Sequence, residues 1–437
     1  MNIKTKDKKI IIILVLSIFI IALLPRLIII SRAINIPPQD TDGYEALATN
    51  IMNYGEFSSN GRLTSLHEPF YPFFLASIYY FLGHSYMAAE IIQAVLGALT
   101  CIIIFLISIN LFPLPVAIVA ALVSCFNPGF IKSSTHLMTE NLYTFLFVVA
   151  IYFLIRQTKE GGFKNLIFSG ITLGIAALTR SATLLFPIFI LFFIRKKLTA
   201  SSYSAKRYIL SIVIFIFFFS VTILPWTLRN WRVHHRFVPI CTKGGLALYC
   251  AYDPPKDKLA GLLATSDTFK RSELMASEMD KNDFLVKETL KFIKNNPLKV
   301  LKLGVLKIAF FWSLFDWEII GYGVYNFMYG FILPFFIYGI FITARRFAEL
   351  LPVYLPIFYS FLITLLIYGS PRFRLPIEPY LIVIASAGIV HFVLRFSNKI
   401  YGFLLTAIYF ILNLFLYFNS YQTKLFVKSI FEKIHLW

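Results

Sequence analysis

The chain has 437 residues, of which 58% are hydrophobic and only 14% are charged, and its formal net charge is +19. This composition, with a mean hydropathy of +0.74, excludes an ordinary soluble globular domain and favours a protein that has the bilayer as its solvent. No nucleic-acid partner is expected, because membrane proteins usually keep their Lys and Arg residues in short loops that fix orientation.

The first apolar segment, residues 10–30, comes after lysines at positions 4, 6, 8 and 9. It is longer than the hydrophobic region of a signal peptide, contains Arg26, and leads to Pro37-Pro38 without a small-residue cleavage site. We therefore expect a retained membrane anchor with a cytoplasmic N-terminus.

Further apolar runs predict an all-α, polytopic membrane protein with about eleven transmembrane helices, within a range of about ten to thirteen. The later spans are expected at residues 86–112, 114–128, 139–155, 165–178, 182–194, 208–228, 325–343, 350–368, 375–394 and 401–419. Basic groups at 156–164, 195–207, 345–346 and 395–399 then lie on the cytoplasmic side, which is where loop Lys and Arg concentrate.

This register leaves regions 31–85, 129–138 and 229–296 outside, and these are where function is expected. The chain then divides into three units: an N-terminal catalytic transmembrane module (1–228, with the first external loop at 31–85), an external loop subdomain with an interfacial helix (229–320), and C-terminal transmembrane helices (321–437). Residues 298–317 are ambiguous because lysines recur in an apolar run; we expect an interfacial helix, and a crossing here would invert every later segment.

The cysteines fall into two pairs. Cys101 and Cys125 lie in apolar spans and are expected to be packing residues. Cys241 and Cys250 share the external loop, where a disulfide is one alternative. Neither CxxC nor HExxH occurs, so metal ligands remain unknown from the sequence.

Two acidic residues open the first external region. Asp42 is followed by Glu45 ahead of apolar residues at helical spacing, which is a capping-box pattern, so Asp42 is expected to cap that helix. Asp40 precedes the helix and would be free to act as a general base in a cleft; the alternative is an ordinary solvated loop acid. His67 and Glu68 precede a short apolar helix, where they are candidates for substrate binding or for a rim position without a role.

Glu140 begins an apolar span, where a carboxylate is costly unless it faces a polar cavity or a partner. It is therefore a site candidate. The alternative is an acid that the helix dipole favours, with Thr139 or Ser134 as the cap. Lys132 lies nearby in the sequence and adds positive potential.

Three arginines lie at the external ends of expected spans. Arg180 stands at the end of a helical hairpin, and Arg372 and Arg374 lie in a Pro-bounded turn. Most loop Lys and Arg residues are expected on the cytoplasmic side, and these arginines are exceptions. We therefore expect them to hold a lipid phosphate or pyrophosphate; the alternative is snorkelling to headgroups. For the basic, aromatic stretch from Trp226 to Arg232, the headgroup-anchor interpretation is the stronger one.

Several short motifs occur in a specific order. They are Asp40 four residues before Tyr44, Pro69-Phe70-Tyr71-Pro72, Thr139-Glu140, Leu178-Thr179-Arg180, Pro225-Trp226 with Arg229-Asn230, and Arg372-Phe373-Arg374-Leu375-Pro376. In this order they resemble the bacterial membrane glycosyltransferases of the GT-C fold that are related to protein O-mannosyltransferases and to the lipid A aminoarabinose transferase. The resemblance extends over nearly the whole chain.

The resemblance implies a GT-C-type architecture with external interfacial helices. It also implies a multi-pass protein of the cell membrane that moves a sugar from a polyprenyl-phosphate donor to a glycan, lipid or protein acceptor on the non-cytoplasmic face. Asp40 would deprotonate the acceptor, Glu140 would shape the acceptor site or help hold a divalent metal ion, and the arginines would neutralise the leaving phosphate. The remaining substrate-binding candidates are Asp42, Tyr44, His67, Glu68, Tyr71 and Lys132.

Two other classes stay open. A transporter or flippase of a lipid-linked substrate would place polar residues near the middle of the bilayer, whereas the mid-span positions here are mostly apolar. A non-catalytic membrane subunit that only binds lipid or protein partners would tolerate the loss of Asp40.

Overall fold

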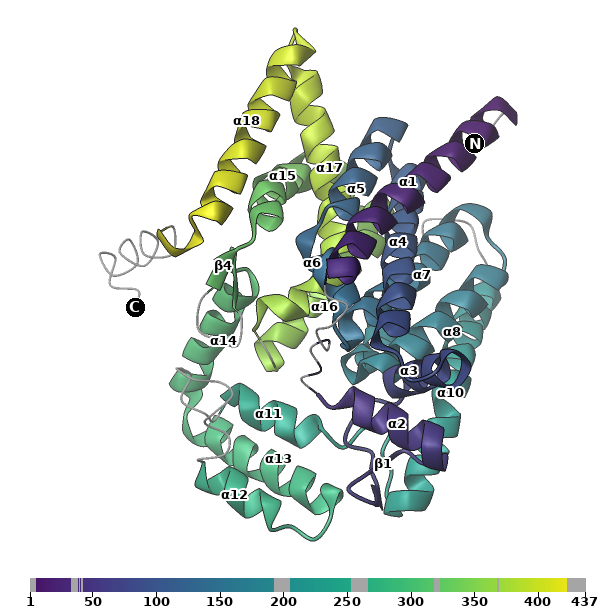
Figure 1. Ribbon diagram of the computed structural model, residues 1–437, viewed down its shortest axis with the longest axis vertical. Coiled ribbons are helices and arrows are strands. Elements are labelled where there is room, and N and C mark those ends of the chain that lie inside the picture. Colours follow the sequence, from purple (N-terminus) through teal and green to yellow (C-terminus); the bar gives the residue numbers. More distant parts are fainter. Residues whose placement is uncertain are drawn as a thin grey trace.

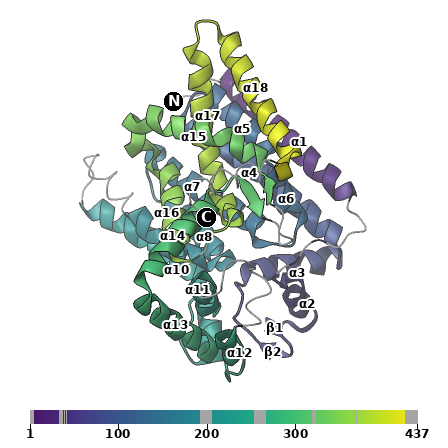
Figure 2. The same ribbon diagram turned by 90° about the vertical axis from the view of Figure 1, so that its left-hand side faces the viewer.

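The computed structural model describes residues 5–32, 38, 40, 42–191, 205–252, 266–317, 323–367 and 369–422. Within these ranges, long apolar helices form a bundle, and shorter helices gather at one end of it, at the bottom of Figure 1. We call this the polar end. Figure 2 shows the same arrangement from the side, with α11–α13 below α14 and the β1–β2 hairpin beside α2.

The helices of the bundle are α1 (Thr5–Arg32), α4 (Tyr86–Leu111), α5 (Leu114–Cys125), α7 (Thr139–Glu160), α8 (Lys164–Thr179), α10 (Ala205–His234), α15 (Phe327–Thr343), α16 (Phe347–Leu366), α17 (Glu378–Arg395) and α18 (Lys399–Phe418). The other helices are α2 (Tyr44–Tyr54), α3 (Phe70–Leu82), α6 (Pro128–Lys132), α11 (Gly244–Tyr252), α12 (Asp267–Glu273), α13 (Glu278–Asn295) and α14 (Pro297–Phe311).

Short 3-10 turns and two small hairpins connect these helices. The turns are η1 (Ser133–Thr135), η2 (Ser181–Leu185), η4 (Ala344–Arg346) and η5 (Pro371–Ile377). The antiparallel pairs are β1 (Ser58–Ser59) with β2 (Arg62–Leu63), Ser58 opposite Leu63, and β3 (Phe315–Trp317) with β4 (Gly323–Tyr325), Phe315 opposite Tyr325.

The multi-pass, all-α fold is confirmed, but the count of eleven spans is not. In the described part of the chain, 7 helical stretches are long and apolar enough to cross a membrane, or 8 if α5 and the bent helix after it count as one span. α8 has 16 residues and so is about 24 Å long, less than a hydrocarbon core of about 30 Å. The span expected at 182–194 extends beyond the described residues.

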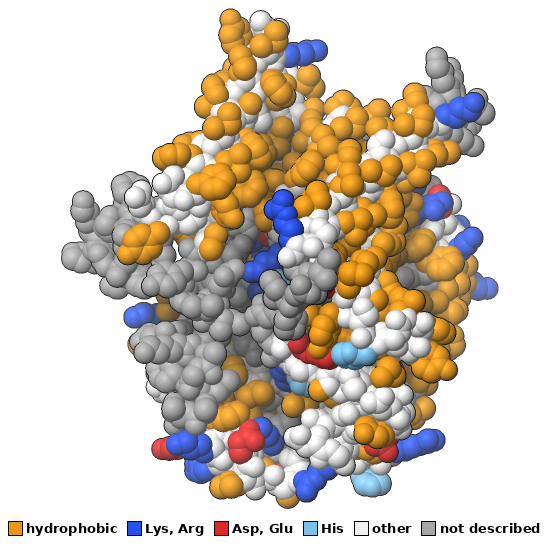
Figure 3. All heavy atoms as spheres, viewed as in Figure 1, with side chains coloured by type: hydrophobic (Ala, Val, Ile, Leu, Met, Phe, Trp, Pro, Cys, Tyr) orange, Lys and Arg blue, Asp and Glu red, His pale blue; other side chains and the backbone are white. Residues whose placement is uncertain are grey.

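The most enclosed helix is α17, in which every residue from Glu378 to Ile389 is buried. It packs closely on α15, because a Cβ added at Gly388 would stand 2.2 Å from the carbonyl oxygen of Phe335. A helix that is apolar all round belongs in the core of a bundle. By contrast, α1 and α18 turn apolar side chains outward, and hydrophobic side chains cover the upper part of the face in Figure 3.

The ambiguous segment forms α14, which is not among the helices that could span a membrane. Its outer face exposes Leu298, Leu301 and Val305, whereas Leu303 and Lys307 are buried against the protein. Its place at a membrane interface stays a prediction.

Candidate functional site

Charged side chains from five separate parts of the chain meet at the N-terminal end of α7. Glu140, in the first turn of α7, forms an ion pair with Arg372 of η5 through its Oε1. Arg180 Nη1 lies 3.6 Å from the same oxygen. Arg372 Nη2 also lies 3.4 Å from Asp42 Oδ2, and Asp42 Oδ1 lies 3.2 Å from Lys243 Nζ. We call Asp42, Glu140, Arg180, Lys243 and Arg372 the charge cluster.

The cluster runs from a buried acid to accessible cations. The side chain of Glu140 is 4% exposed, whereas that of Arg372 is 35% exposed and that of Lys243 is 30% exposed. Glu140 thus lies at the inner wall and holds two guanidinium groups in place, as expected for a carboxylate at the start of an apolar helix. The accessible cations can exchange protein carboxylates for an incoming anion.

The capping role that the sequence assigned to Asp42 belongs to Asp40, and the base role expected of Asp40 stays a prediction. Asp40 caps α2: its Oδ1 accepts the amides of Asp42 (3.3 Å), Gly43 (2.9 Å) and Tyr44 (3.1 Å), and its Oδ2 accepts that of Glu45 (2.8 Å). The residue before the helix is Gly43, with φ +73°, a left-handed conformation that costs glycine little. This turn places four amides within hydrogen-bond distance of Asp40. It leaves the side chain of Asp42 in contact with Lys243 and Arg372.

Electrostatics keep Asp42 ionised and His67 neutral. Burial alone would raise the pKa of Asp42, but the charges of Lys243 and Arg372 outweigh it and lower the pKa. For His67, burial and the charge of Lys243 lower the pKa, against the carboxylates of Asp42 and Glu68. His67 Nδ1 is buried and has no hydrogen-bond partner among the described residues.

Of the aromatic candidates, Tyr44 borders the acids and Tyr71 lies in the core. The ring of Tyr44 meets His67 edge-on at 5.6 Å and Tyr71 at 5.1 Å. Tyr71 is 0% exposed, and its hydroxyl donates to Gln93 Oε1 at 2.9 Å. The helical turn of α3 directs the ring of Tyr71 into the bundle, and the expectation that Tyr71 binds substrate stays a prediction.

Glu68 positions the arginine of the neighbouring turn. Its Oε1 accepts the amide of Ser181 at 3.0 Å and the Ser181 hydroxyl at 2.7 Å, directly after Arg180. Arg180 in turn lies over the ring of Phe373, 5.1 Å from its centroid, within η5. Glu68 thus acts on the site through the backbone that carries Arg180.

Arg374 does not share the environment of Arg372. It is 0% exposed; its Nη1 donates to the carbonyl oxygens of Phe311 and Ser313 at 2.9 Å each, and its Nε lies 3.2 Å from Glu378 Oε1. Two residues of a 3-10 turn are about 240° apart around its axis, so the two guanidinium groups point in different directions. Arg374 ties η5 to the end of α14, and the expectation that it holds a phosphate stays a prediction. Lys132, at the end of α6, is exposed, and its role stays a prediction.

Trp226 and Arg229, at the basic, aromatic end of α10, bond to backbone groups of the protein rather than to lipid headgroups. Arg229 Nη1 donates to the carbonyl oxygen of Thr64 at 2.7 Å, and its Nη2 donates to that of Phe57 at 3.0 Å. Trp226 is 8% exposed, and its Nε1 donates to the carbonyl oxygen of Ile240 at 2.7 Å. The headgroup-anchor expectation is therefore wrong for both residues, because the first loop folds back over them.

The charge cluster offers a poor environment for a divalent cation. Asp42 and Glu140 both face Arg372, whose positive charge lies where they converge. In the ranges that the structure describes, no group of three or more His, Cys, Asp or Glu side chains gathers as ligands would. These residues therefore do not fit a divalent metal in this arrangement.

No disulfide joins Cys241 to Cys250. From Gly244 onward the chain runs as α11, so Cys250 lies about 9 Å along a helix axis, beyond the usual reach of the bond. Burial raises the pKa of the Cys241 thiol to about 12, and the thiol lies 3.5 Å from the hydroxyl of Ser181.

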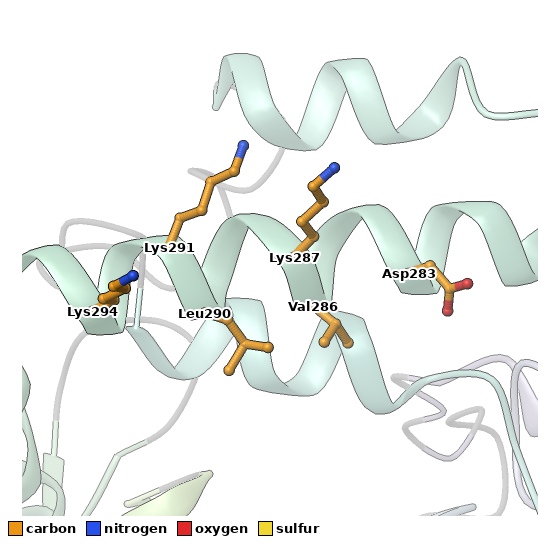
Figure 4. A pocket seen from close by; sticks show the side chains of 6 residues that line it. All are labelled: Asp283, Val286, Lys287, Leu290, Lys291 and Lys294. Atoms are coloured by element: carbon orange, nitrogen blue, oxygen red, sulfur yellow. The ribbon is translucent and has the colours of Figure 1, made fainter.

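Lys243 is the member of the cluster that the sequence did not single out. It lies just before α11, in a region with many other lysines, and no motif sets it apart. A separate hollow of about 450 Å³ on α13 is shallow and shares no residue with the cluster. Figure 4 shows its lining side chains on α13, among them Lys287, Lys291 and the exposed Leu290, whereas Leu285 and Thr289 are the buried residues of this helix.

Comparisons with known proteins place the fold. Residues 66–226 match the family model described as dolichyl-phosphate-mannose-protein mannosyltransferase. These residues include Glu140 and Arg180 of the cluster, but not Asp42, Lys243 or Arg372. Among curated protein sequences, none matches the chain.

Among solved structures, the archaeal oligosaccharyltransferase AglB from Archaeoglobus fulgidus, in complex with an inhibitory peptide and a dolichol-phosphate, has a TM-score of 0.58 and 16% identity, covering 92% of this chain and 55% of that one. The Archaeoglobus fulgidus oligosaccharyltransferase in complex with Zn and sulfate gives 0.55 and 15%, covering 91% and 52%. ArnT from Cupriavidus metallidurans, bound to undecaprenyl phosphate, gives 12% identity over 90% and 81%, with a TM-score of 0.38 that is too low to establish a common fold.

The chain thus spans about half the length of the oligosaccharyltransferases that it matches. Its helices correspond to theirs over nine-tenths of its own length, while the family match lies on the segment from α3 to α10. The chain is therefore a polytopic membrane protein with the GT-C fold, and its residues 66–226 are similar to the dolichyl-phosphate-mannose-protein mannosyltransferase family model.

Proposed function

We propose that the protein is a membrane glycosyltransferase that moves a sugar from a polyprenyl-phosphate-linked donor to a hydroxyl or amine of an acceptor. One observation carries the proposal: the ionised carboxylate of Asp42 lies against two accessible cations, Lys243 and Arg372. A base beside fixed positive charge is what sugar transfer from a phosphate carrier requires. The dolichol-phosphate in the AglB structure supports this choice of donor.

In the proposed reaction, an acceptor oxygen or nitrogen forms a bond to the anomeric carbon of the sugar while the bond from that carbon to the phosphate oxygen breaks. The carrier phosphate keeps the electron pair and gains negative charge. Arg372 and Lys243, with Arg180 behind them, stabilise this charge, and Asp42 takes the acceptor proton. Binding of the phosphate draws the cations away from Asp42 and makes the carboxylate more basic.

Asp42 is better placed than Asp40 to be the base. Four backbone amides occupy the oxygens of Asp40, whereas the oxygens of Asp42 face cations that a phosphate can displace. Asp40, the base that the family resemblance implies, then acts by holding the turn that presents Asp42. Glu140 acts in the same indirect way, by orienting Arg180 and Arg372.

We further propose that the charge cluster faces the non-cytoplasmic side of the cell membrane. It lies at the N-terminal end of α7, and Lys159 lies near the other end of this 22-residue helix, about 33 Å long. There Lys159 bonds the carbonyl oxygen of Asn110, and Arg346 bonds that of Leu111, so two basic turns share this end. Basic turns favour the cytoplasm, which leaves the cluster outside.

The test is transfer of radiolabelled sugar from polyprenyl-phosphate donors in membranes that contain equal amounts of each variant. We expect Asp42→Asn to lose about 100-fold or more in turnover and to keep donor binding, and Arg372→Ala to weaken donor binding. Asp283→Asn, on the exposed face of α13, is the matched control and should behave as wild type.

Other outcomes assign the roles differently. If Asp40→Asn loses turnover and Asp42→Asn does not, Asp40 is the base. If no polyprenyl-phosphate donor supports transfer by the wild-type protein, the glycosyltransferase proposal fails, and transport or flipping of a lipid-linked substrate becomes the better interpretation.

A further inference from the structure

Glu278, the first residue of α13, connects the α11–α13 helices to the two loops beside the charge cluster. Its Oε2 accepts the amide of Ser65 at 3.0 Å and the hydroxyl of Thr242 at 3.0 Å, and its Oε1 accepts the hydroxyl of Thr64. Thr64 and Ser65 come more than 200 positions before Glu278 in the sequence, and Thr242 comes 36 positions before it. Two loops that are remote in sequence therefore share one carboxylate.

The two loops also bond to each other at this point. The amide of Thr242 donates to the carbonyl oxygen of Ser65 at 2.8 Å. Ser65 Oγ lies 2.8 Å from His234 Nε2 and donates to Asn230 Oδ1 at 2.7 Å, so the end of α10 completes the junction. The groups that bond to Glu278 are all hydrogen-bond donors. A carboxylate has two acceptor oxygens and can accept from all of them together.

Both loops lead directly from this junction to residues at the charge cluster. Ser65 lies two positions before His67, and Thr242 lies directly before Lys243. Lys243 Nζ reaches Asp42 Oδ1, and His67 lies close enough to Lys243 and Asp42 for their charges to act on its pKa. A shift of either loop by about 1 Å would move Lys243 out of contact with the carboxylate.

We propose that Glu278 is a positioning residue: it clamps the loop of His67 to the loop of Lys243 and so sets the place of Lys243 beside Asp42. The consequence for catalysis rests on the proposed glycosyltransferase function, whereas the clamp itself does not. Through Glu278, α13 thereby acts on the site without a residue of its own in the charge cluster.

A first measurement tests the clamp without any assay of activity. Hydrogen exchange is monitored on the full-length protein in nanodiscs of phosphatidylcholine and phosphatidylglycerol. Glu278→Ala should speed exchange in both 64–68 and 242–246 by about tenfold, because a charge-assisted hydrogen bond is lost at each loop. Glu278→Gln, which keeps an acceptor oxygen, should restore most of the protection. Glu288→Ala, a partly exposed and ion-paired position on the same helix, is the control.

A second measurement asks whether Glu278 acts through Lys243. Binding of undecaprenyl phosphate to the same nanodiscs should weaken about tenfold in Glu278→Ala and about tenfold in Lys243→Ala, with little further loss in the double variant. A residue that only stabilised the fold would give additive losses. If Glu278→Ala does not fold, Glu278→Asp replaces it. The shorter side chain keeps the charge but no longer reaches both loops, so the same results are expected.

The outcomes separate the two proposals. Unchanged exchange in either loop, or additive binding losses, overturns the role of Glu278. Coupled exchange and binding without any sugar transfer by the wild-type protein would leave the clamp standing and refute the glycosyltransferase function.

Discussion

Asp40 satisfies four backbone amides that the first turn of α2 would otherwise leave without partners. Replacing a capping side chain with alanine typically costs about 0.5–2 kcal/mol, and this cap receives more bonds than most. We expect Asp40→Ala to lower the free energy of unfolding by about 2 kcal/mol and Asp40→Asn to lower it less, because the amide oxygen still accepts.

Chemical unfolding in mild detergent, monitored by circular dichroism, measures this difference. Asp280→Ala, in the first turn of α13, should cost less, because α13 already has Ser277 as its cap. Equal stability of Asp40→Ala and wild type would mean that the bonds to Asp40 contribute nothing to α2.

His67 makes stability depend on pH in a direction that its environment sets. Its pKa in the folded protein lies below 6.5, so the unfolded chain takes up the proton first as the pH falls. Stability should therefore be complete above pH 6.5, decrease as the pH falls through this value, and level off below the folded pKa. Thermal unfolding of wild type and His67→Gln from pH 8 to pH 5 measures the effect, and the variant should lose less stability on acidification. A steeper loss in His67→Gln would contradict the lowered pKa.

At the scale of helices, α15 and α17 depend on glycine for their close contact. A Cβ at Gly388 would meet the backbone of Phe335, whereas a Cβ at Gly304 on α14 would come no closer than 3.6 Å, to Leu365. Gly388→Ala should thus cost about 1–3 kcal/mol by overpacking, while Gly304→Ala should be neutral or slightly stabilising. Because η5 leads directly into α17, we also expect Gly388→Ala to disturb Arg372 and weaken polyprenyl-phosphate binding. Thermal unfolding and binding of both variants test this, and equal behaviour would contradict the close contact.

The helices could be predicted from the sequence because a membrane span depends on a local property, a long apolar run. The run expected at 139–155 begins with α7 and lies wholly within it, and the one expected at 375–394 is close to α17. The count of spans could not be predicted in the same way. Whether a short helix such as α8 crosses depends on its neighbours and on the bilayer, not on its own composition.

The site could be predicted only in part, because its geometry depends on tertiary contacts. Glu140 and Arg372 stood out, since a charge at the end of an apolar run needs a partner wherever the fold supplies one. That Asp40 rather than Asp42 caps α2 depends on the left-handed turn at Gly43, and the proposed place of Lys243 depends on the bonds of Glu278 in α13. The spacing of residues along the chain predicts neither feature.

At the scale of the whole molecule, charge divides the bundle into two ends. The turns after α7 and α15 are basic, and the charge cluster and α11–α13 lie at the polar end (Figure 1). The arginines of the cluster are held in ion pairs with its carboxylates, whereas the Lys and Arg residues of the basic turns lie at the opposite end. The two ends should therefore differ in their access to a reagent that does not cross the membrane.

Single cysteines at two exposed serines test this orientation. Ser277→Cys lies before α13 at the polar end, and Ser397→Cys lies in the turn between α17 and α18. In intact cells, an impermeant maleimide should label Ser277→Cys, whereas Ser397→Cys should react only after the membrane is opened, because its turn lies between Arg395 and Lys399. The wild-type chain gives the background, which should be low for Cys241 because burial raises its pKa to about 12. The reverse pattern would place the charge cluster in the cytoplasm and would require a donor whose sugar faces that side.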